Sequence, residues 1–118
     1  MSKRLFSKDH LWVFQTDNTV KIGISDYAQK KLKSVLFLTL PETGEQVVFG
    51  KRFGDIESVK TVSDLISPIT GVVTQINEDL LDDPSAINEN PYDSWLIKVE
   101  GDIIADALMD EETYKSYV

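Results

Sequence analysis

The apolar residues of this chain recur mostly at every second position, which is the spacing of β-strands with one face turned toward a core. The segments "TVKIGI" (residues 19–24) and "SWLIKVE" (94–100) both alternate in this way. In the second segment we expect Leu96 and Lys98 on the outer face. The two segments predict strands that are covered on one side only.

Three further stretches have the composition of strands. "VLFLTL" (35–40) is apolar almost throughout and is followed by proline, which predicts a strand covered on both faces and closed by a turn. "GVVTQIN" (71–77) follows the turn sequence "SPITG". The segments 51–60 and 63–73 are both extended and meet near residues 59–62, which predicts a hairpin. Many short strands with frequent turns indicate a small barrel or sandwich.

Helical signals are few and lie between or after the strands. Ser25 can cap "DYAQKKLK" (26–33), which has aspartate in its first turn and lysines toward its end. Asp83 can cap a short segment that begins with one proline and ends before the next (84–90). A last helix is predicted over "DEETYKSY" (110–117). We expect these helices to cap a β core.

The composition restricts the partners and the compartment. The chain has 118 residues, which we interpret as one domain, 1–118. Twelve Lys and Arg against twenty Asp and Glu give a net charge of −8, which disfavours a nucleic acid partner. The chain has no cysteine, as is typical of proteins in a reducing compartment. Because no apolar stretch has the length of a signal peptide or a membrane span, we expect a cytoplasmic protein without a membrane partner.

One lysine, Lys60, stands near the tip of the predicted hairpin, within "ESVKTVSD" (57–64). The tripeptide Val-Lys-Thr alone carries little information, because short motifs match by chance and a lysine at a hairpin tip commonly does no more than contact solvent. The longer sequence around it is more specific.

The stretch "FGDIESVKTVSDLISPITGVV" (53–73) closely resembles the segment that carries the lipoyl-lysine in the glycine cleavage system H protein family. Upstream, "DHLWV" and "VKIGISDYAQKKL" resemble the opening strand and first helix of that family. Downstream, "NPYDSWLIKV" and "DEETYKSY" resemble its last strand and terminal helix. The motifs follow the family's order and extend from about residue 6 to residue 117.

The resemblance implies a mainly β fold, a flattened barrel-sandwich hybrid of the biotinyl and lipoyl carrier type with a few short peripheral helices and a C-terminal helix. It also implies that lipoate is attached covalently to Lys60 and that the chain is a carrier, not an enzyme. An acceptor lysine must enter other active sites, so it needs an exposed turn on a rigid sheet. Glu57 and Asp64 flank Lys60 as in the family, and they either orient a lipoyl-attaching enzyme by charge or simply solvate the hairpin.

The resemblance further implies a function and its partners. Such a carrier takes the aminomethyl group of glycine from a pyridoxal phosphate glycine decarboxylase and passes it to an aminomethyltransferase that uses tetrahydrofolate. A flavin-dependent dihydrolipoamide dehydrogenase reoxidises the lipoyl arm. A lipoyl ligase or octanoyltransferase supplies the arm, and no metal or catalytic residue of the chain itself is implied.

Three positions depart from the family's pattern. Where the family usually reads Ser-His-Glu-Trp, this chain has Asp9-His10-Leu11-Trp12. Leu11 cannot accept the hydrogen bond that the family's glutamate is thought to make with the amine of the loaded arm. Asp9, two residues away on a predicted strand, can offer a carboxylate on the same face. Lys33 stands where the family commonly has glycine, and we interpret His10 as a packing or edge residue without a chemical role.

Three alternative functions stay open. Leu11 and Lys33 favour a lipoyl relay, which hands lipoyl groups to other complexes and need not bind an aminomethyl group. A biotin carrier is disfavoured because such domains usually flank their lysine with methionines. An independent enzyme built on the paired carboxylates Asp82 and Asp83 is disfavoured because acids before a proline indicate the start of a helix.

Overall fold

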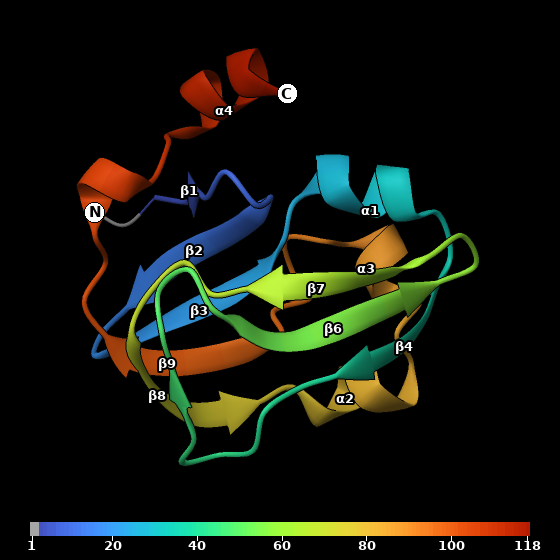
Figure 1. The fold of residues 1–118 in the computed structure, drawn as a ribbon, viewed down its shortest axis with the longest axis horizontal. Helices are drawn as coiled ribbons and strands as arrows, with labels where there is room; N and C mark the ends of the chain where they lie inside the picture. Colours follow the sequence, from blue (N-terminus) through green and yellow to red (C-terminus); the bar gives the residue numbers. More distant parts are fainter. Residues whose placement is uncertain (1–2) are drawn as a thin grey trace.

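The computed structural model describes residues 3–118, which form two antiparallel sheets with short helices around them (Figure 1). The larger sheet has the strand order β1-β2-β3-β9-β8-β5, and the smaller has the order β4-β6-β7. The strands are β1 (Leu5–Phe6), β2 (Leu11–Thr16), β3 (Thr19–Ile24), β4 (Val35–Thr39), β5 (Gln46–Val47), β6 (Arg52–Ser58), β7 (Val62–Ile66), β8 (Gly71–Ile76) and β9 (Ile97–Gly101). The helices are α1 (Asp26–Leu32), α2 (Glu78–Asp82), α3 (Ala86–Glu89), the 3-10 turn η1 (Ala105–Ala107) and α4 (Glu111–Tyr117). In this part of the chain no helix is long and apolar enough to cross a membrane.

The main core lies between the two sheets and draws on the inward residues of both. One apolar cluster of buried residues includes Ile22, Ile56, Leu65, Val73 and Val99, each of which is at most 2% exposed. Removing these side chains from water is the main favourable contribution to folding. The predicted mainly β fold with peripheral helices is confirmed, including the strands expected over residues 19–24 and 71–77.

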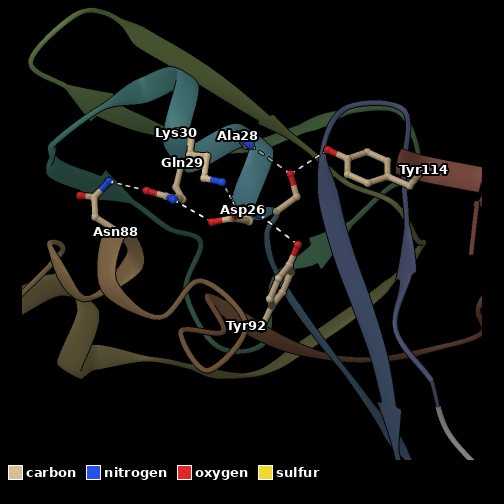
Figure 2. Close-up of polar contacts among 8 residues, drawn as sticks. Asp26, Ala28, Gln29, Lys30, Asn88, Tyr92 and Tyr114 are labelled. Atoms are coloured by element: carbon tan, nitrogen blue, oxygen red, sulfur yellow. Dashed lines mark hydrogen bonds and ion pairs between the residues drawn. The ribbon is translucent and has the colours of Figure 1, made fainter. Parts of the chain in front are cut away.

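Helix α1 begins where the sequence predicts, because Ser25 caps it. The Ser25 hydroxyl oxygen accepts a hydrogen bond from the Ala28 N–H at 3.1 Å and shares another with the Tyr114 hydroxyl at 2.7 Å. The Asp26 N–H donates to the Tyr92 hydroxyl at 3.1 Å (Figure 2). Two tyrosines from distant parts of the sequence therefore fix the start of α1.

The predicted C-terminal helix is present as α4 and packs on the first strand. The Asp110 carboxylate caps it by accepting a hydrogen bond from the Thr113 N–H at 2.8 Å. The Tyr114 ring stacks on Phe6 with a centroid distance of 4.5 Å, and Tyr114 is buried. Tyr114 thus has two roles: its ring anchors α4 on Phe6, and its hydroxyl supports the Ser25 cap of α1.

Strand β4 is not covered on both faces, and that prediction is wrong. Val35 is buried, whereas Leu36 is 42% and Phe37 64% exposed. The physical reason is that β4 is an edge strand of the smaller sheet and that none of the described helices lies over the outer face of this sheet, which is nearest the viewer in Figure 1. An apolar run can therefore mark an open surface as well as a doubly covered strand.

The alternation predicted for residues 94–100 is wrong in its first half. Strand β9 begins only at Ile97, and Leu96 is fully buried although we expected it to face outward. The Leu96 N–H donates to the carbonyl of Ile22 at 2.7 Å while the chain is still irregular, so period-two alternation does not apply there. Trp95 is half-buried, and the Lys98 ammonium lies 4.8 Å from the centre of its ring.

Asp83 does not cap a following helix, contrary to the prediction. It ends α2, a short helix that we did not predict, and its carboxylate accepts a hydrogen bond from the Ser85 hydroxyl at 2.6 Å. Ser85 occupies the N-cap position of α3, and α3 ends before Pro91 as expected. The adjacent acids Asp82 and Asp83 therefore mark the end of one helix and not the start of another.

Lys33, which follows α1, has a backbone conformation that favours glycine. Its φ is 64° and its ψ is −145°. A side chain in this region costs about 1–3 kcal/mol. The Asn88 side-chain amide donates to the Gln29 side chain at 3.0 Å (Figure 2). The same amide donates to the Lys33 carbonyl at 2.7 Å, so the neighbouring helix α3 holds the turn in place.

We predict that Lys33→Gly stabilises the protein by about 1 kcal/mol, because it removes the steric strain at positive φ. The matched control is Lys31→Gly, which places glycine inside α1 and should destabilise by about 1 kcal/mol. Urea unfolding of both variants and of the wild type measures these changes. A Lys33→Gly variant as unstable as Lys31→Gly would contradict the assigned conformation.

Candidate functional site

The predicted hairpin is formed by β6 and β7, and Lys60 lies at its tip. The two strands pair up to Glu57 and Val62, which leaves Val59 and Lys60 as the turn. The Ser58 N–H closes this turn by donating to the Thr61 carbonyl at 2.8 Å. Lys60 is thus placed by the register of two strands.

The side chain of Ser58 holds the turn from inside. Its oxygen accepts hydrogen bonds from the N–H groups of Lys60 and Thr61, each at 3.2 Å, and its hydroxyl donates to the Thr61 carbonyl at 3.2 Å. Ser58 is buried, so these bonds are shielded from water. The Val59 N–H donates to the carbonyl of Ser34 at 3.0 Å, which ties the tip to the loop before β4. The backbone N–H groups of residues 58–61 therefore all donate to partners within the protein.

The side chain of Lys60, unlike the backbone of the turn, is not held by neighbouring residues of the described chain 3–118. It is exposed, and across residues 3–118 it takes part in none of the ion pairs, which join Lys30 to Asp26 and Arg52 to Asp55 and Asp64. An amine held on a fixed backbone and not engaged by a carboxylate can enter the active site of another protein.

The acids near Lys60 lie on the outer face of the smaller sheet. Glu57 belongs to this face, and Asp64 stands directly across from Asp55. Two carboxylates opposite each other repel, but Arg52 lies between them and binds both. Its Nε lies 3.1 Å from the Asp64 carboxylate, and one of its terminal nitrogens binds the Asp55 carboxylate. These hydrogen bonds, that to Asp55 first, raise the pKa of Arg52. Asp64 is therefore already paired in this structure.

A cleft of about 280 Å³ opens beside the hairpin, between β7, α1 and the turn that precedes β2. The apolar residues that line it are Leu11, Ile24, Ala28, Leu32, Ile56 and Leu65. The polar residues that line it are Asp9, His10, Tyr27, Lys31, Ser63 and Asp64. Most of the apolar residues are buried and the charged ones are exposed, so the cleft has an apolar floor and a polar rim.

Asp9 and Asp64 meet at this rim although 55 positions separate them in the sequence, from 9 to 64. Asp9 lies in a turn and not on a strand, because β2 begins only at Leu11, so the reason given above for its placement is wrong. The turn nevertheless brings Asp9 to the same cleft as Leu11. The Asp9 carboxylate is thus available to a cationic group in the cleft, and Asp64 can offer its Oδ2, because Arg52 binds only its Oδ1.

His10 forms part of the cleft wall and is held by aromatic neighbours. Its φ is 71°, and its Nδ1 hydrogen-bonds to the Tyr114 hydroxyl at 2.8 Å. The ring lies 4.9 Å from that of Tyr27. Burial lowers the pKa of His10, and the charge of Asp9 opposes this only in part. His10 therefore favours its neutral form, which suits the packing role predicted for it.

Two residues of the site were not found from the sequence. Ser58 carried a weak signal, because serine is a common turn former and stands two positions before Lys60. Arg52 carried none, because its contact with Asp64 exists only once β6 and β7 are in register. In the part of the chain that the structure describes, no three His, Asp, Glu or Cys residues are grouped as metal ligands.

The family described as "Glycine cleavage H-protein" matches residues 4–118 of this sequence. The chain belongs to the glycine cleavage H-protein family.

Individual members of this family are similar over nearly their full length. The glycine cleavage system H protein of Lachnoclostridium phytofermentans is 42% identical over 115 residues, which cover 97% of this chain and 91% of that protein. The H protein of Oceanobacillus iheyensis is 43% identical over 117 residues, covering 97% and 93%. The crystal structure of the H protein from Mycobacterium marinum superimposes with a TM-score of 0.90 at 35% identity and covers 96% of this chain and 94% of that one. The expected barrel-sandwich fold is confirmed by this match.

The structure shows what the departures of this H protein mean physically. Leu11 is 2% exposed on the floor of the cleft, where a glutamate would need a partner for its charge. Lys33 occupies a positive-φ position, which glycine adopts with less strain than lysine. The first change alters the chemistry of the cleft, whereas the second affects the stability of a turn.

We predict that Ser58→Ala loosens the turn without unfolding the hairpin, because the N–H groups of Lys60 and Thr61 lose their acceptor. Each lost hydrogen bond is worth about 1 kcal/mol, so these two amides should exchange their hydrogens roughly fivefold faster. Hydrogen exchange followed by NMR measures both rates. The control is Ser63→Ala, since Ser63 lines the cleft and its side chain takes part in no described hydrogen bond. Equal exchange rates in the two variants would show that Ser58 does not hold the tip.

Proposed function

We propose that this H protein carries lipoate as an amide on Nζ of Lys60 and shuttles the aminomethyl group of glycine between the enzymes of the glycine cleavage system in the cytoplasm. The observation that carries the proposal is the position of Lys60, exposed and unpaired at the tip of a turn whose backbone Ser58 fixes. A cleft with an apolar floor lies along the same hairpin, where Ile56 of β6 and Ser63, Asp64 and Leu65 of β7 line it. The chain supplies placement and is not a catalyst.

The described residues fit a lipoyl group in two respects. The amine of Lys60 is accessible, so in its neutral form it can attack the carbonyl carbon of an activated acyl group. A carbon–nitrogen bond forms, the bond to the leaving group breaks, and a proton leaves Nζ. The product is an amide, which removes the positive charge of the lysine. The cleft in turn offers buried apolar side chains to the hydrocarbon part of the arm.

When attached, the lipoyl group supplies a disulfide that receives the aminomethyl cargo, and the protein determines where this cargo rests. Asp9 and Asp64 line the cleft and can hold an ammonium group by charge-assisted hydrogen bonds. The apolar floor around Leu11 keeps water from the cargo. Arg52 binds only Oδ1 of Asp64, so Oδ2 can accept such a bond while the ion pair with Arg52 stays in place.

The proposed partners all meet the same arm. They are a pyridoxal phosphate glycine decarboxylase, a tetrahydrofolate-dependent aminomethyltransferase, a dihydrolipoamide dehydrogenase, and a lipoyl ligase or octanoyltransferase that attaches the arm. Each contact must be brief, because the arm visits several sites in one cycle. The net charge of −8 suits rapid docking to basic surfaces, and such association weakens as salt rises.

A second function, the lipoyl relay, is favoured by two observations. Leu11 provides no acceptor on the cleft floor, and Asp64 is already bound to Arg52. Both weaken the hold on an aminomethyl group without affecting attachment of lipoate at Lys60. A relay and a shuttle therefore both carry lipoate on Lys60. They differ in whether the cleft holds the aminomethyl group of the loaded arm.

We predict that coexpression with a lipoate ligase adds one lipoyl group to the wild type and none to Lys60→Arg, because arginine is not acylated. Intact-mass analysis measures the adduct, and peptide mapping places it. Lys51→Arg, which changes an exposed lysine at the other end of β6, is the control and should be modified fully. An adduct that persists in Lys60→Arg rules out the proposed attachment site.

We further predict that Asp9→Asn and Asp64→Asn, each in the lipoylated protein, release the aminomethyl group from the loaded arm roughly tenfold faster, since a charge-assisted hydrogen bond is worth about 1.5–3 kcal/mol. The measurement is the rate of formaldehyde and ammonia release after loading by glycine decarboxylase. Asp82→Asn, distant from the cleft lining, should match the wild type. If the lipoylated wild type supports no exchange between glycine and labelled bicarbonate, the chain is a relay and not a shuttle.

A further inference from the structure

The outer face of the smaller sheet carries an exposed apolar row that the carrier function does not itself require. Phe37, Glu57 and Val62 lie side by side across β4, β6 and β7, because Glu57 pairs with Phe37 on one side and with Val62 on the other. Phe37 is 64% exposed, Val62 58%, and Val59 in the adjoining turn 60%. No other large apolar side chain among residues 3–118 is as exposed as these three.

This row lies next to the proposed acceptor lysine. Val59 precedes Lys60 directly, and Val62 begins β7 immediately after the turn. No helix or strand lies in front of β6 and β7 in the view of Figure 1. Exposure of this kind costs free energy in water, and exposed apolar patches commonly mark interaction sites.

The reach of the lysine side chain indicates which partner meets the row. An unmodified lysine extends only about 6 Å from its Cα, as its bond lengths dictate. An enzyme that acylates Lys60 must therefore bring its active site to the hairpin itself and contact the residues beside it. Enzymes that act on the far end of a lipoyl arm are not brought as close. The attaching enzyme is thus the partner that must cover this row.

The charge of the row restricts the partner further. Glu57 stands between Phe37 and Val62 and forms no ion pair within residues 3–118. A second copy of this chain on a two-fold axis would bring one Glu57 toward the other, which is repulsive. A surface with an apolar patch around a lysine or arginine is complementary instead.

We propose that the row of Phe37, Glu57 and Val62, together with Val59, is the docking surface for the enzyme that acylates Lys60, and that this enzyme presents an apolar patch with a basic side chain opposite Glu57. The inference rests on the proposed function, since it presupposes that Lys60 is acylated. The apolar side chains supply the contact, and Glu57 sets the orientation.

The test measures lipoylation of the full chain by a purified lipoate ligase with ATP and lipoic acid. Phe37→Thr and Val62→Thr both place threonine, a residue compatible with strands, while removing apolar surface. Each should raise KM roughly tenfold at unchanged kcat, as expected for a residue at the centre of an interface. The controls are Phe49→Thr and Val72→Thr, whose wild-type residues are 40% and 44% exposed outside the row, and both should behave as wild type.

Two companion measurements separate docking from other effects. The midpoint of urea unfolding should be alike in all variants, and a small acylating reagent such as an acetyl N-hydroxysuccinimide ester should label Lys60 at an unchanged rate. Glu57→Gln should weaken recognition, and Glu57→Asp should restore part of it.

Three results would overturn the proposal. One is a kcat/KM for lipoylation within twofold of wild type in both Phe37→Thr and Val62→Thr. The second is normal lipoylation with impaired glycine–bicarbonate exchange, which would assign the row to a different enzyme. The third is a wild-type dimer that Phe37→Thr dissociates in sedimentation. Failure of the wild type to be lipoylated at all would instead refute the function on which the inference rests.

Discussion

The hydrogen bonds of the Ser58 side chain are the constraint on which the rest of the site depends. A two-residue turn exposes backbone groups that would otherwise compete for water and let the tip fluctuate. Ser58 binds the N–H groups of Lys60 and Thr61 from the buried side, so the turn has one arrangement and the lysine side chain remains free. The sheet gives this turn a rigid base, and both the cleft and the apolar row take their positions relative to it.

The cleft depends on contacts that begin far from it. Helix α1 forms one wall, and its start is fixed by Ser25, which hydrogen-bonds to Tyr114 of the C-terminal helix. Tyr114 also holds His10, a second part of the wall. The terminal helix therefore supports the cleft through one hydroxyl group, although α4 itself contributes no lining residue. This arrangement gives α4, which packs on the edge strand β1 of the larger sheet, a role in shaping the site.

Much of the fold is predictable from the sequence because period-two alternation, caps and turn residues are local signals. The strands over 19–24 and 71–77, the Ser25 cap and the hairpin with Lys60 at its tip follow from such signals. The exposure of β4 does not, because whether an apolar strand has one covered face or two depends on what else packs there. The pairing of Arg52 with Asp64 and the meeting of Asp9 with Asp64 depend on strand register and on a turn, which no local pattern specifies.

In the proposed function, acylation of Lys60 changes the charge of the face that the partners meet. While Lys60 is unmodified, its positive charge partly offsets the negative charge of the acids on the outer face, which include Glu57 three positions earlier in the sequence. Once the amide forms, that charge is gone and the protein is one unit more negative than its formal −8. The attaching enzyme therefore approaches a tip of mixed charge with an apolar row, whereas the enzymes of the shuttle approach a more acidic face with a neutral arm. Loss of the ammonium favours release of the carrier from an enzyme that recognised the lysine, and the added negative charge favours its capture by basic surfaces. One covalent bond can thus order the sequence of partners without any change in the fold.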